Sequence, residues 1–157
     1  MGIGFRPIRG NWRTVSFPVA SAATFQTWAP VDWDGARNLI EATSASTSIV
    51  GVALSYSTAS FPNAAGVNCV LVAVPVDQSA VAETNIATNV AASAISFGQA
   101  YNITKATNNL RCDTASQASV LVEIVSSGVV DSVRSTVEVA FVVNRRAYSS
   151  VSSTVIY

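Results

Sequence analysis

Residues 133–143 read Val-Arg-Ser-Thr-Val-Glu-Val-Ala-Phe-Val-Val, and apolar side chains recur at every second position. In an extended chain, one face would carry Val133, Ser135, Val137, Val139, Phe141 and Val143, and the other Arg134, Thr136 and Glu138. Alternation with a period of two is typical of a β-strand that turns one face toward a core. Residues 133–143 therefore predict such a strand.

The same signal extends outward along the chain. Residues 119–125 predict a second strand, and the connector 126–131, which contains Gly128, would join the two as a hairpin. Residues 69–76 form a continuous apolar run, as in a strand buried on both faces, with Pro75 placed near the strand's end because proline donates no ladder hydrogen bond.

Further strands are predicted toward the N-terminus. Residues 48–56 predict one in which Gly51 marks a bulge or a close backbone approach. Residues 29–33 and 39–42 flank Asp34-Gly35, a turn-forming pair typical of a hairpin tip.

The region from residue 79 to residue 112 is less regular. The alanines in 79–98 would permit a helix, but their Thr, Asn and Ser neighbours oppose it, so we expect a strand at 81–86 and a loop or one helical turn near 91–96. Turns at 97–98 and 108–109 should lead into further extended segments. The sequence therefore predicts an all-β protein with a single domain, either a jelly-roll-like β-sandwich or a small β-barrel.

Both ends of the chain read as arms. Residues 1–13 show no alternation, yet they contain Phe5 and Trp12, so we expect an N-terminal arm that docks on a partner. Residues 14–146 form the predicted β domain. Residues 147–157 alternate Val and Ser, and we expect this tail to pair with its own sheet or with a neighbour's.

The composition indicates a protein that is buried in an assembly. Of the 157 residues, 50% are hydrophobic and only 11% are charged, against a globular average of about 25%. A polar but uncharged surface of Ser, Thr and Asn is the alternative explanation. The nine basic and nine acidic residues cancel, which argues against nucleic acid as a partner because phosphate binding needs a basic footprint.

Two further patterns concern the compartment in which the chain is made. No apolar run approaches the ~20 residues that cross a bilayer, so no membrane partner is expected, and the N-terminus lacks the apolar core of a signal peptide. We therefore expect synthesis in the cytoplasm, with Cys69 and Cys112 reduced and buried. A disulfide between them stays open for oxidising surroundings.

The side chains that usually carry catalysis are scarce. The sequence has no histidine, which removes the commonest general base and the common catalytic triads. Residues 32–35, Asp-Trp-Asp-Gly, superficially match a calcium loop but lack its later acidic ligands. We therefore predict no enzyme activity, no metal and no cofactor.

Three tryptophans leave two readings open. Trp28 and Trp33 lie on or beside consecutive predicted strands, where they would seal a core or an interface. Together with Trp12 they could instead form a platform that stacks on sugar rings, as in carbohydrate-binding β-sandwich modules.

The order of segments along the chain matches a known pattern. A hairpin is followed by residues 42–54, Ala-Thr-Ser-Ala-Ser-Thr-Ser-Ile-Val-Gly-Val-Ala-Leu, and residues 98–103, Gly-Gln-Ala-Tyr-Asn-Ile, with Asp113-Thr114 precede the last strands. This series, over residues 15–146, resembles the small head decoration, or cement, proteins of tailed bacteriophages.

The resemblance implies a structural virion protein without catalytic residues. It would sit on the exterior of an icosahedral capsid after synthesis in the host cytoplasm, as a homotrimer that bridges subunits of the major capsid protein. We expect residues 1–13 to lie on the shell, with Phe5 and Trp12 as anchors and Arg6, Arg9 and Arg13 meeting acidic groups. The alternatives are a tail or fibre subunit, or a carbohydrate-binding module.

Overall fold

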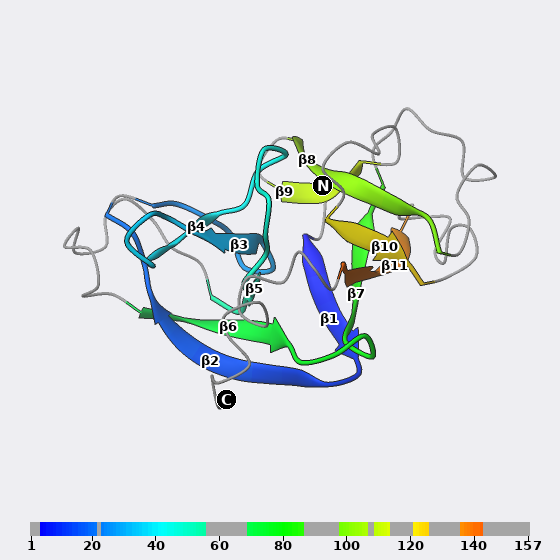
Figure 1. The fold of residues 1–157 in the computed structure, drawn as a ribbon, viewed down its shortest axis with the longest axis horizontal. Coiled ribbons are helices and arrows are strands. Elements are labelled where there is room, and N and C mark those ends of the chain that lie inside the picture. Colours follow the sequence, from blue (N-terminus) through cyan, green and yellow to red (C-terminus); the bar gives the residue numbers. More distant parts are fainter. Residues whose placement is uncertain are drawn as a thin grey trace.

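The computed structural model describes residues 4–21, 23–55, 69–86, 98–106, 109–113, 121–125 and 136–142, with backbone alone for 104–106 and 109–113. These residues form eleven strands, and no helix occurs among them. The strands make two antiparallel sheets that pack as a sandwich (Figure 1). The all-β prediction is confirmed, in its sandwich form.

Sheet A is built mainly from the C-terminal half of the chain. In spatial order its strands are β1 (Phe5–Arg9), β7 (Val81–Asn85), β11 (Thr136–Phe141), β10 (Val122–Ile124) and β8 (Ala100–Ala106), and β9 (Asn109–Asp113) extends the sheet as a hairpin with β8. The β10–β11 pairing is the hairpin that the alternating C-terminal segments predicted.

Sheet B comes entirely from the N-terminal half. Its order is β2 (Trp12–Pro18), β6 (Cys69–Pro75), β5 (Gly51–Ala53), β3 (Pro30–Trp33) and β4 (Leu39–Glu41). An isolated bridge joins Val19 to Leu39, and the Ala20 N–H donates to the Leu39 carbonyl at 3.0 Å. Sheet B therefore curls so far that β4 meets the end of β2.

The chain passes between the sheets at two adjacent turns, one after β1 and one after β6. The Asn11 side chain donates to Asp77 Oδ2 at 2.7 Å, and the Asn11 backbone N–H donates to Ser79 Oγ at 3.0 Å. Gly10 has φ +87°, and a Cβ there would lie 1.6 Å from the Ser79 carbonyl oxygen. Only glycine fits this crossing.

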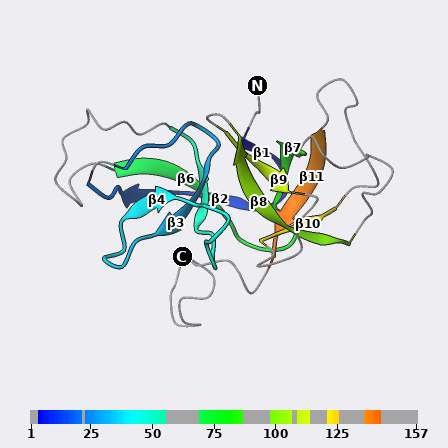
Figure 2. The same cartoon turned by 90° about the horizontal axis from the view of Figure 1, so that it is seen from above.

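Two hydrophobic clusters fill the interior. The first joins sheet A to β5 and its flanking loop, through Phe5, Ala42, Ile49, Val52, Ala82, Ile86, Tyr101, Ile103, Leu121, Val122, Ile124, Val137, Val139 and Phe141. The second lies inside the curl of sheet B, through Phe17, Val19, Phe25, Ala29, Val31, Leu39, Val50, Ala53, Val70, Val72 and Val74. Strand β5 contributes Val52 to one cluster and Ala53 to the other, so its two faces are both buried. Figure 2 shows β3, β4 and β6 of sheet B on one side of the molecule and β7, β8, β10 and β11 of sheet A on the other.

The predicted strand faces are largely confirmed. On β11, Val137, Val139 and Phe141 are buried, as alternation predicted, although Thr136 on the opposite face is buried too. Pro75 is the last residue of β6, as expected. Gly51 makes the predicted close approach, since a Cβ there would lie 2.3 Å from the Ala73 carbonyl oxygen.

Two predictions, about the length of β5 and the burial of Cys69 on β6, are wrong. Strand β5 is three residues long instead of spanning 48–56. Cys69 is exposed and free rather than buried, because it shares the outer face of sheet B with exposed Leu71. The side chain of Cys112, the helical turn expected near 91–96 and the tail at 147–157 lie outside the described residues.

Candidate interaction surface

The prediction of an N-terminal arm is wrong. Residues 5–9 are strand β1 of sheet A and residues 12–18 are strand β2 of sheet B, so the segment is woven into both sheets (Figure 1). The absence of alternation misled the prediction because the segment changes sheets at Gly10–Asn11 and carries a bulge at Pro7–Arg9. The boundary between an arm and a domain at residue 13 therefore does not exist in the described chain.

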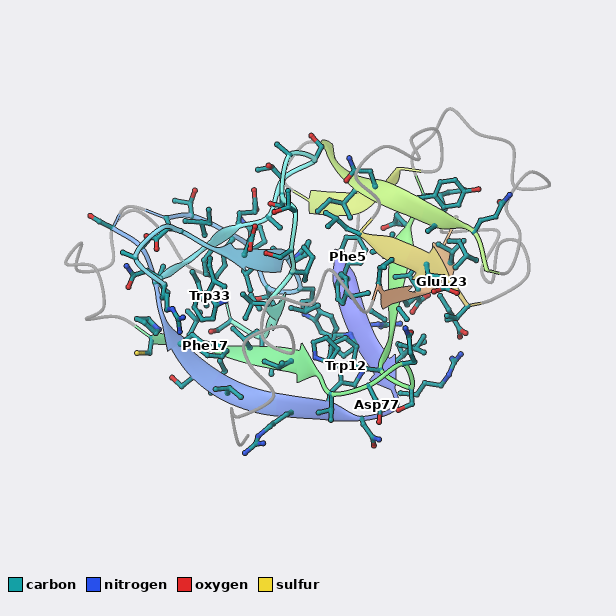
Figure 3. All side chains as sticks on the ribbon, in the orientation of Figure 1. Phe5, Trp12, Phe17, Trp33, Asp77 and Glu123 are labelled. Carbon is teal, nitrogen blue, oxygen red and sulfur yellow. The ribbon has the colours of Figure 1, made fainter. Side chains whose placement is uncertain are left out.

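Phe5 is a core residue rather than a docking anchor. Its side chain is fully buried, and its ring centroid lies 5.8 Å from that of Phe141 on β11. Its N–H donates to the Trp28 carbonyl at 2.7 Å, which ties β1 to the loop before β3. Figure 3 shows Phe5 where the two sheets meet. In this fold, Phe5 has no exposed surface to offer a partner.

The bulge in β1 places two arginines on one face of sheet A. Arg6 is opposite Glu83, and Arg9 would fall on the other face if the strand were regular, because it is three residues further on. The register shift between Pro7 and Arg9 returns Arg9 to the outer face, opposite Val81. Both guanidinium groups thus project over the same surface of β7 and β11.

These arginines complete a charge ladder, which we define as Arg6, Glu83, Glu138 and Arg9. Glu83 and Glu138 are direct neighbours on β7 and β11, an arrangement of like charges that is unfavourable by itself. Arg6 forms an ion pair with Glu83, and Arg9 pairs with Glu138 at 2.6 Å. The ladder is therefore neutral as a unit.

The hydrogen bond between Arg9 and Glu138 shifts the pKa of both groups. The Arg9 guanidinium, through its hydrogen bond and its charge, lowers the pKa of Glu138 below the ordinary 4.5. The same contact raises the pKa of Arg9. Because the Arg9 side chain is 51% exposed, solvent screening limits the pair to a contribution below about 1 kcal/mol.

Trp28 links the two sheets through its backbone. It adopts φ +73°, which is uncommon outside glycine. Its N–H donates to the Ala53 carbonyl of β5 at 2.6 Å, while its own carbonyl accepts from Phe5 of β1. The Arg6 guanidinium carbon lies 5.9 Å from its ring centroid, within the range of a cation–π contact. The strained backbone is thus held from both sheets.

The three tryptophans do not share one surface. Trp12 and Trp28 pack against the first cluster, and the Trp12 indole N–H donates to the Arg9 carbonyl at 2.8 Å. Trp33 packs against the second cluster and meets the Phe17 ring edge to face, with centroids 5.0 Å apart (Figure 3). Each ring thus supports a core, as the core-or-interface interpretation expected.

The last predicted contact, Arg13, lies on β2, opposite Val74 of β6, and is exposed. Of the five predicted capsid-binding residues, the structure brings Arg6 and Arg9 together on the outer face of sheet A. Trp12 lies beside them through its bond to Arg9. Phe5 points inward, and Arg13 belongs to the other sheet.

Exposed apolar side chains mark a second surface, which the sequence analysis missed. Leu54 and Leu71 are neighbours on the outer face of sheet B, where the Leu54 N–H donates to the Leu71 carbonyl at 2.8 Å. Leu71 is 49% exposed, and the exposed Cys69, two residues before it on β6, lies on the same face. We call Leu54, Leu71 and Cys69 the apolar patch. In a strand at 69–75, alternate residues must face outward, but every residue there is apolar. No polar side chains therefore distinguished the outer face from the inner one in the sequence.

The carboxylates of the β3–β4 hairpin serve the hairpin itself. Asp34 Oδ1 accepts from the backbone N–H groups of Asn38 and Ala36, both at 2.8 Å, and these bonds lower the pKa of Asp34. Asp32 Oδ1 accepts from the Trp33 N–H and the Ser48 hydroxyl. Among the described residues, no group of three or more possible metal ligands occurs.

Within the part of the chain that the structure describes, no helix has the length and apolar character needed to cross a membrane. Comparison with known proteins finds no matching family model, no matching curated protein and no matching solved structure.

Proposed function

We propose that this chain is a structural virion protein that decorates the outer surface of an icosahedral phage capsid and bridges neighbouring subunits of the major capsid protein. The ordered segments within residues 15–146 that resemble head decoration proteins support the proposal. The low charge content supports it as well, because the cores of protein interfaces are depleted of charged residues.

The observation that carries the proposal is how the described surface distributes charge and apolar area. Two of the chain's few arginines, Arg6 and Arg9, already have acidic partners within the molecule. Leu71 and Val76, in contrast, are about half exposed, at 49% and 50%. A surface that neutralises its charges internally and leaves apolar side chains outside suits burial against another protein.

This distribution changes which residues we place on the shell. Arg6 and Arg9 can reach capsid carboxylates only by competing with Glu83 and Glu138. We therefore place the main capsid contact at the apolar patch, and keep Arg13 as an exposed basic contact. Trp12 contributes by packing against the first cluster and holding β2 in place.

The mechanism needs no chemistry on a substrate. A protein that binds the assembled shell better than free capsid subunits stabilises the shell by mass action. Many copies on one lattice reinforce each other, because a copy that contacts two capsid subunits binds the second at high effective concentration. Modest contacts at each apolar patch therefore suffice.

Electron microscopy of bare capsids mixed with the purified protein tests the proposal. We expect regular protrusions on the shell, and their loss in the Leu71→Glu variant because a charge would enter the apolar contact. The Ile8→Glu variant is the matched control, since Ile8 is 37% exposed on the edge strand of sheet A, and it should still decorate. Capsids that stay bare with the unaltered protein, or glycan binding without any shell, would overturn the proposal.

A further inference from the structure

Strand β2 is the longest sheet edge in the described chain, and it lacks the usual protection. Its seven residues pair with β6 in an unbroken register. The edge strand β1 is interrupted by Pro7 and a bulge, and β4 has only three residues and meets Val19. Proline, bulges, short strands and charged side chains are devices that prevent edge-to-edge pairing. Strand β2 carries its only proline at its last residue and has one charged side chain, Arg13.

The hydrogen bonds around β6 show which backbone groups of β2 face outward. The Asn11 carbonyl accepts from Val76 N–H at 3.0 Å, so the odd-numbered residues of this segment bond toward β6. The Leu71 carbonyl of β6 accepts from the N–H of Leu54, just after β5, and so points away from β2. The backbone groups of Ser16, which is opposite Leu71, therefore take no part in the hydrogen bonds between β2 and β6.

The outward groups of β2 that stay open are therefore those of Trp12, Thr14 and Ser16, because the parallel bridge between Val19 and Leu39 brings β4 against the Pro18 carbonyl. The Ala20 N–H continues this alternation and donates to Leu39 of β4. Within the described part of the chain, the outward backbone groups of Trp12, Thr14 and Ser16 have no hydrogen-bond partner. The edge is thus open from residue 12 to the point where β4 arrives.

We infer that β2 of a second copy of this chain pairs with this edge, antiparallel, about a two-fold axis at Thr14. In that register Thr14 faces Thr14, Trp12 of each copy faces Ser16 of the other, and each such pair exchanges two hydrogen bonds. Every open residue of β2 then finds a partner, whereas a register centred on Val15 would bring Trp12 against the Pro18 carbonyl, where β4 already lies.

The side chains of β2 are compatible with this self-pairing. Arg13 is the only charged residue of the strand, and the register places it opposite Val15 of the second copy instead of opposite the other Arg13. Like charges therefore do not meet directly. Thr14 of one copy meets Thr14 of the other across the junction, and a Thr–Thr pair is a favourable cross-strand pair.

Pairing with a second copy would also serve the assembly role proposed above, although it depends on the contacts of β2 alone. A two-fold contact yields a dimer, whereas the resemblance to decoration proteins implies a trimer. It also joins the two copies of sheet B into one continuous sheet. Because the contact is a single strand pair, we expect dimers in concentrated samples and dissociation on dilution.

Sedimentation equilibrium across a wide range of protein concentration tests the inference. The unaltered protein should pass from monomer to dimer. Thr14→Pro removes an N–H that points away from β6, so this variant should fold and stay monomeric, while the matched Thr14→Val variant should still dimerise. A trimer, a monomer at every concentration, or a dimer that survives Thr14→Pro would overturn the inference.

A cross-link covers the case in which Thr14→Pro fails to fold. In a background with Cys69→Ser and Cys112→Ser, the Thr14→Cys variant should form a disulfide between copies, because paired Cα atoms lie about 5.5 Å apart in a hydrogen-bonded pair. The absence of a covalent dimer under oxidation would contradict the register. Capsid decoration by Thr14→Pro is scored separately, so failure of the two-fold contact leaves the decoration proposal open to its own test.

Discussion

Replacing Phe5 by alanine separates a structural strand from a detachable arm. The Phe5 side chain is fully buried and packs on the ring of Phe141, two strands away in sheet A. Truncation of a buried phenylalanine removes its transfer free energy and leaves a cavity, which together cost about 3–5 kcal/mol. Because β1 is an edge strand that can relax, we expect the lower end, about 3 kcal/mol.

Urea unfolding followed by tryptophan fluorescence measures this loss, since Trp12 and Trp28 pack against the cluster that contains Phe5. For a chain of this size, about 3 kcal/mol corresponds to a decrease in Tm of roughly 6–12 °C. Ile8→Ala on the same strand is the control, because Ile8 is 37% exposed and exposed substitutions usually change stability by less than about 0.5 kcal/mol.

The result that would refute this reasoning is equal stability of Phe5→Ala and Ile8→Ala. It would mean that β1 contributes nothing to the fold and that the segment behaves as a free arm after all. If Phe5→Ala does not fold, Phe5→Leu provides a milder truncation, with an expected cost of about 1 kcal/mol. A slope of unfolding free energy against urea that matches the unaltered protein would show that the folded state keeps its compactness.

Three further outcomes follow from the described contacts. Arg9 lowers the pKa of Glu138 below 4.5. The ion pair therefore stabilises the fold above that pH and loses its effect as the pH falls through the lowered pKa. The difference in unfolding free energy between the unaltered protein and Glu138→Gln, measured by urea unfolding, should shrink on acidification. Gly10→Ala should cost more than about 3 kcal/mol or prevent folding, whereas Gly35→Ala, whose Cβ would meet nothing within 4 Å, should change thermal unfolding little. Deleting residues 2–13 should abolish cooperative unfolding in calorimetry, because it removes all of β1 and the start of β2; a cooperative truncated protein would contradict the fold.

Local alternation was enough to predict most of sheet A and the hairpins. The pattern of 133–143 marked the buried face of β11, and the Asp34-Gly35 pair marked the β3–β4 turn, because both signals act over a few residues. Buried Thr136 lay beyond this signal. Its burial depends on which strands and loops cover the second face of the sheet, and that information is not local.

The candidate site was less predictable than the fold. The pairing of Arg6 with Glu83 and of Arg9 with Glu138 joins residues 77 and 129 positions apart. It also depends on a bulge that re-aims Arg9. A bulge adds one residue to a strand and reverses the alternation beyond it, so a regular reading assigns the wrong face. The exposed basic residues were therefore identified, but their neutralisation was not.

The separate placement of β1 has a consequence for how the chain folds as it leaves the ribosome. All strands of sheet B lie between residues 12 and 75, so they can pair early in translation, whereas β1 waits for β7 at residues 81–85. Until then Phe5 and its neighbours stay exposed, and chains that emerge close together on one message could exchange this first strand. Chaperone demand during synthesis should therefore concentrate on Phe5–Arg9.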